Sequence, residues 1–143
     1  AGEIEALLDD YLGRLATLET RKRQLAALRS SLDGEETRRQ IGKLRAKLPD
    51  IESADHRREY QASIDQLQRQ LELDAELGRD LELIELRLTS ALSSLRQLRV
   101  ELARSKGQDD LGRLESMEEL RRRSQDLQEY LGDLRQAYDD LKQ

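Results

Sequence analysis

Leucines recur along this chain at alternating steps of three and four residues, and no other feature constrains its fold as much. In residues 3–32 the run includes Tyr11, Leu15 and Leu18. Such steps place side chains on one narrow helical stripe, the seam of a left-handed coiled coil. The sequence has 29 leucines against one valine and no phenylalanine or tryptophan, so the residues that favour strands are nearly missing. We therefore predict an all-α protein.

Three breaks interrupt the periodic sequence. Asp33-Gly34 is a turn or helix-end signal, and Pro49 disfavours helical backbone at the residue before it. Gly107, followed by acidic residues, indicates a helix stop and a new cap. These breaks predict four helices, the third of them long, over residues 3–32, 35–48, 53–106 and 110–142.

The third predicted helix differs between its two halves. Residues 60–71 carry one apolar stripe, but residues 77–102 carry two. One of the two includes Leu77, Leu81 and Ile84. The other consists of Leu83, Leu86, Ser90, Ser93, Gln97 and Val100. At about 100° per residue, the two stripes point in nearly opposite directions.

Folding back at Pro49 and at Gly107 accounts for this difference, because residues 78–102 are then flanked by both the first and the fourth helix. We expect those helices to cover opposite faces of the third. The predicted architecture is a single elongated domain over residues 1–143: an antiparallel coiled coil or three-helix bundle, two-stranded at the end near Pro49. Such a pattern resembles antiparallel coiled coils and spectrin-type bundles, without the aromatic anchors of spectrin repeats.

The heptad register slips by three residues between Leu71 and Leu81. Asp74 and Gly78 occupy slots that an unbroken heptad would give to apolar residues. The slip predicts local overwinding or a bend. It marks either the change from two helical neighbours to three, or a hinge.

The residues that catalysis and metal binding need are scarce. The chain has no cysteine and a single histidine, His56, and its glycines do not form a phosphate-binding loop. We predict no enzymatic activity, no cofactor and no metal site. A net charge of −5 disfavours nucleic acid as the main partner, and no stretch of 18 apolar residues could span a membrane.

The short second helix concentrates basic residues. An anion-binding hypothesis would have them hold the phosphates of an acidic membrane surface or of a nucleic acid. The alternative is a solvated helix face, because no aromatic residue lies among them to stack on a base. The five candidates are Arg38, Arg39, Lys43, Arg45 and Lys47.

The stretch 88–95 carries no charge, in a chain of which 38 % is charged. Its small side chains allow close approach of another helix. The second stripe of the third helix, from Leu83 to Val100, is thus the candidate surface for a homodimer or for a helical protein partner. We expect a non-enzymatic scaffold or oligomerisation segment of a larger cytoplasmic protein. Two alternatives are peripheral binding to anionic membranes or nucleic acid, and a spacer arm of an ATPase or receptor.

Overall fold

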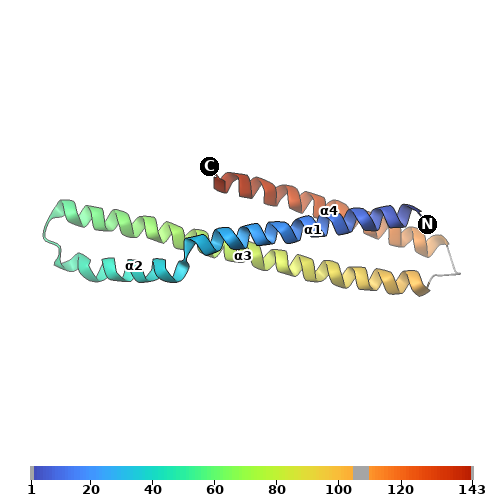
Figure 1. Ribbon diagram of the computed structural model, residues 1–143, viewed down its shortest axis with the longest axis horizontal. Helices are drawn as coiled ribbons and strands as arrows, with labels where there is room; N and C mark the ends of the chain where they lie inside the picture. The colour runs from blue at the N-terminus through green and yellow to red at the C-terminus, as the bar shows by residue number, and fades with distance from the viewer. Residues whose placement is uncertain (1, 105–109, 143) are drawn as a thin grey trace. The chain divides into compact units, whose positions relative to one another are not determined.

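The structure, a computed structural model, describes residues 2–104 and 110–142, which are almost entirely helical (Figure 1). No strand occurs among these residues, and the all-α prediction is confirmed. The break predicted at Gly107 lies outside the described residues. In chain order the elements are α1 (Gly2–Leu32), α2 (Gly34–Lys47), the 3₁₀ turn η1 (Leu48–Asp50), α3 (Ala54–Arg104) and α4 (Asp110–Lys142).

Asp33 separates α1 from α2. Its backbone is left-handed, with φ 43°, and its carboxylate accepts a hydrogen bond from the Glu36 backbone N–H at 3.3 Å. The Thr37 hydroxyl donates to the carbonyl oxygens of Leu32 and Asp33 at 3.0 and 2.9 Å. The chain therefore leaves one helix and starts the next within a single residue, because side chains satisfy backbone groups that the break exposes.

The second break is the one that Pro49 imposes. Pro49 lies in the first turn of η1. The backbone N–H groups of a first turn have no acceptor within the helix, so the N–H that proline lacks is not needed there. After η1 the chain is extended at Ile51, and α3 begins at Ala54. Ser53 caps α3, since its hydroxyl accepts from the His56 backbone N–H at 3.4 Å.

The chain divides into two compact units. Unit 1 comprises Ala1–Arg23 and Leu83–Gln143, and unit 2 comprises Gln24–Glu82. Both α1 and α3 contribute residues to each unit.

Unit 1 contains three helical segments, and each of them touches the other two. Arg14 of α1 bonds to Ser124 of α4, and Arg87 of α3 lies over the ring of Tyr130 of α4 at 3.9 Å. Lys22 of α1 forms an ion pair with Glu85 of α3 at 3.1 Å. The interior is formed by buried apolar side chains from all three segments, among them Tyr11, Leu18, Ile84, Ala91, Leu98, Leu120 and Leu127.

These contacts correct the expectation that α1 and α4 cover opposite faces of α3. The two helices adjoin each other, so both pack on the same side of α3. Leu83 is 43 % exposed and Leu86 is 61 % exposed, whereas Ile84 between them is fully buried. In a triangle of helices, each helix meets its two neighbours through one broad stripe, so a second stripe on the far side is not covered.

Unit 2 contains the end of α1, α2, η1 and the first part of α3. Figure 1 shows α2 beside that part of α3, joined to it by η1 and residues 51–53. Four large apolar side chains are buried in unit 2: Leu25 of α1, Ile41 of α2, and Ile64 and Leu77 of α3. One apolar stripe on each helix is enough for this pairing.

Candidate interaction surface

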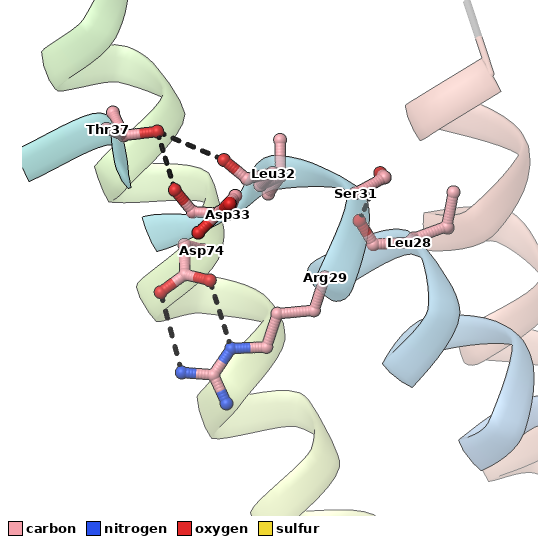
Figure 2. Close-up of polar contacts among 7 residues, drawn as sticks. All are labelled: Leu28, Arg29, Ser31, Leu32, Asp33, Thr37 and Asp74. Carbon is pink, nitrogen blue, oxygen red and sulfur yellow. Dashed lines mark hydrogen bonds and ion pairs between the residues drawn. The ribbon is translucent and has the colours of Figure 1, made fainter. Parts of the chain in front are cut away.

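A polar layer lies in unit 2 at the point where α1 ends. Arg29 Nε donates to Asp74 Oδ1 at 3.2 Å, and Nη2 lies 3.5 Å from Oδ2 (Figure 2). The Asp74 side chain is only 14 % exposed, so its charge is largely removed from water. A two-pronged guanidinium contact of this kind compensates a desolvated carboxylate better than a single contact would.

Two glycines make room for this layer. A Cβ at Gly78 would lie 2.8 Å from the Arg29 guanidinium, and a Cβ at Gly34 would lie 3.1 Å from the Asp74 carboxylate. Asp74 and Gly78 are the residues that occupy the irregular heptad slots between Leu71 and Leu81. The slip in the leucine pattern therefore coincides with a place where α3 receives an arginine of α1. Helix α3 is continuous there, and a hinge at this position stays a prediction.

A second polar cluster joins α1 to α4 in unit 1. The Ser124 hydroxyl donates to Asp10 Oδ2 at 2.8 Å, and Arg14 donates to the Ser124 carbonyl oxygen at 2.5 Å. Arg14 Nη2 also pairs with Asp10 Oδ2 at 3.3 Å. Ser124 is 4 % exposed and stands in the apolar seam of α4. The cluster gives its hydroxyl the hydrogen-bond partner that a buried polar group needs.

Close to this cluster, a hollow of about 170 Å³ opens between the three helices of unit 1. Its lining includes Tyr11, Leu98 and Leu120, together with Gln97 and Glu101 of α3, both of which are also exposed to solvent. Burial raises the pKa of the Tyr11 phenol, and the positive charge of Arg123 offsets part of that rise. Arg122, which donates a hydrogen bond to the partly exposed Glu119, lowers the pKa of that carboxyl, and the nearby charge of Arg123 adds to the effect.

The exposed large apolar side chains of the described residues all lie in unit 1. Those on the outer side of α3 belong to the second stripe predicted from the sequence, which we call the outer stripe: Leu83, Leu86, Ser90, Ser93, Gln97 and Val100. Every one of these six residues is exposed. The residues next to three of them, Ile84, Ala91 and Leu98, are buried, so α3 presents one face to the interior of unit 1 and the other to solvent.

The basic residues of α2 do not form one patch. At about 100° per residue, Arg38 and Arg45 lie on one flank of α2, while Arg39, Lys43 and Lys47 lie on another. All five are exposed, and Arg39 pairs with Glu36 at 2.7 Å. The structure thus spreads the positive charge around the helix rather than concentrating it.

Within residues 2–104 and 110–142, no group of histidine and carboxylate side chains is arranged to hold a metal ion. His56 is exposed near the start of α3. None of the described helices is both long enough and apolar enough to cross a bilayer. Comparison with known proteins found no matching family model, no similar curated protein and no similar solved structure.

The heptad pattern predicted the outer stripe, but it predicted neither the polar layer of Arg29 and Asp74 nor the polar cluster around Ser124. Arg29 and Ser124 each stand where the heptad run of their helix, α1 or α4, would otherwise have an apolar residue. Their partners, Asp74 and Asp10, are distant in sequence and carry no motif. The one available signal was the pair of irregular slots at Asp74 and Gly78.

Proposed function

We propose that this chain is a non-enzymatic interaction module, a coiled-coil bundle that docks another helix on the outer stripe of α3. The observation that carries this proposal is the contrast along α3 in unit 1. Ile84 is fully buried and Leu86 is 61 % exposed, two residues apart on the same helix. An apolar stripe with heptad spacing on an already packed helix is what a second helical partner needs.

The outer stripe also has the chemistry of a docking surface. Leu83, Leu86 and Val100 provide apolar contact area, and Ser90 and Ser93 between them allow close approach of a second backbone. Leu83 and Leu86, three residues apart, are neighbours on the helix surface, and grouped exposed apolar side chains mark interaction sites more often than isolated ones do.

A photo-reactive amino acid at position 86 tests this function in cells that contain the full protein. We expect adducts from position 86 that are absent from position 92, which lies about 120° around α3 from position 86 and is 52 % exposed, against 61 % for Leu86. The protein in each adduct is identified by mass spectrometry. Its binding is then measured to the purified original chain and to the Leu83→Glu variant. Equal labelling at the two positions, or binding that Leu83→Glu leaves unchanged, would contradict the proposal.

A second candidate function is binding of anionic surfaces through α2, where five basic side chains are exposed. Their division between two flanks and the pairing of Arg39 with Glu36 make this the weaker proposal. Vesicles with about a third anionic lipid, and a mixed-sequence oligonucleotide, test it at low salt. If binding occurs and the triple variant Arg38→Glu, Arg39→Glu, Arg45→Glu abolishes it, α2 is the site; absent or unchanged binding removes this candidate.

A further inference from the structure

We propose that the occupant of the outer stripe is the same stripe of a second copy of this chain, paired parallel and in register. This inference rests on the proposed function, which it deepens by naming the partner. The outer stripe spans two and a half heptads, with Leu83, Ser90 and Gln97 at a positions and Leu86, Ser93 and Val100 at d positions. The side chains in the stripe and beside it favour one partner and one orientation.

Pairing like with like favours the parallel arrangement. In a parallel pair, Leu83 meets Leu83, Leu86 meets Leu86, and Gln97 meets Gln97 of the other copy. Two facing glutamine amides exchange hydrogen bonds, and polar side chains at a positions can set the register of parallel dimers. The antiparallel alternative places Leu86 against Gln97, which leaves the amide without a polar partner.

The charges beside the stripe support the same arrangement. Arg96 occupies a g position and Glu101 the e position five residues later, which is the spacing of ion pairs between parallel coiled-coil strands. None of the residues three or four places from Arg96 is acidic. Within the part of the chain that the structure describes, neither Arg96 nor Glu101 forms an ion pair. The partner copy supplies the opposite charge to each of them.

The extent of the stripe sets the strength of the pair. Arg104 stands at the next a position, where two guanidinium groups would face each other, so the seam ends after Val100. A seam this short buries less surface than stable protein interfaces do. We therefore expect a reversible dimer whose population depends on concentration.

Sedimentation equilibrium of the full chain tests self-association. Between about 1 µM and about 1 mM, a range typical of weak interfaces, the mean mass should rise from the 16.5 kDa of one chain toward twice that value. Leu86→Glu should hold the mass at one chain, whereas the matched control Leu92→Glu should behave as the original chain. Because Leu86 and Leu92 are 61 % and 52 % exposed, neither change should alter helicity.

A charge exchange tests the register. Arg96→Glu alone and Glu101→Arg alone should each weaken association by about tenfold, because each creates like-charge pairs across the two-fold axis. The double variant should restore association, since it re-forms the pairs with their signs reversed. Failure of the double variant to restore what both single variants lose would overturn the parallel register.

The absence of cysteine makes disulfide trapping a direct test of orientation. Val100→Cys should oxidise to a covalent dimer, because the two d-position thiols face each other in the parallel pair. In an antiparallel pair they would lie about 25 Å apart along the helix. A mixture of Leu83→Cys and Val100→Cys that forms the mixed disulfide in preference would therefore overturn the inference.

The outcomes separate this inference from the proposed function. A mass of one chain throughout the concentration range overturns the homodimer. If stripe-dependent photo-adducts to another protein appear at the same time, the docking function holds and only the identity of the partner is wrong.

Discussion

The guanidinium of Arg29 lies 3.2 Å from the carboxylate of Asp74, with the Cα of Gly78 close enough that a methyl group there would touch the same guanidinium. An arginine of α1 thus occupies space that a leucine seam would have filled with an apolar side chain. The polar layer has a consequence for stability, because the ion pair and the glycine depend on each other.

Gly78→Ala should therefore have an effect that depends on Arg29. In the Arg29→Ala background, alanine should stabilise α3 by about 1 kcal/mol, the usual difference in helix propensity. With Arg29 present, the gain should be smaller or absent, because the new methyl group displaces the guanidinium from Asp74. Urea unfolding of the two single variants and the double variant measures the coupling, and simple additivity would show that the two residues do not interact.

Asp33 should tolerate only residues that accept a left-handed backbone and can cap a helix. Asp33→Asn keeps both properties and should change the free energy of unfolding by less than about 0.5 kcal/mol. Asp33→Ala loses the hydrogen bond from the Glu36 N–H and strains the backbone, so it should cost about 2 kcal/mol. Thermal unfolding followed by circular dichroism distinguishes the two, and equal stability of both variants would contradict this role.

The two faces of α3 should respond very differently to truncation. Ile84→Ala removes a fully buried side chain and should cost about 2–5 kcal/mol. Leu86→Ala, two residues later, should change the stability by less than about 0.5 kcal/mol at concentrations where the chain is a monomer. Chemical denaturation at about 1 µM, where a weak interface is dissociated, compares them. A large cost for Leu86→Ala would mean that the chain itself covers the outer stripe.

Tyr11 should make the protein less stable at high pH. Because burial raises the pKa of its phenol above the unfolded value of 10.0, the folded state retains this proton while the unfolded state releases it. The contribution is therefore complete below pH 10 and is lost as the pH rises from about 10 through the folded pKa. Tyr11→Phe should flatten the stability profile above pH 10 relative to the matched control Tyr60→Phe. Identical profiles for the two variants would contradict the assignment.

The sequence by itself determined the helices. Leucine spacing, Asp33-Gly34 and Pro49 predicted where α1, α2 and α3 end or begin, because helix propensity, turn chemistry and the geometry of proline act locally. It also identified both stripes of α3, since their spacing is a property of one helix. The sequence was enough, too, to show how few residues suit catalysis or metal binding.

Only the tertiary structure decided which stripe is covered. One helix cannot reveal whether its two neighbours lie on opposite sides of it or adjoin each other, and the contact of Arg14 with Ser124 shows that α1 and α4 adjoin. The polar layers were hidden for the same reason. The partners of Arg29 and Ser124 lie 45 and 114 residues away in the chain, and their pairing depends on how helices pack rather than on local sequence.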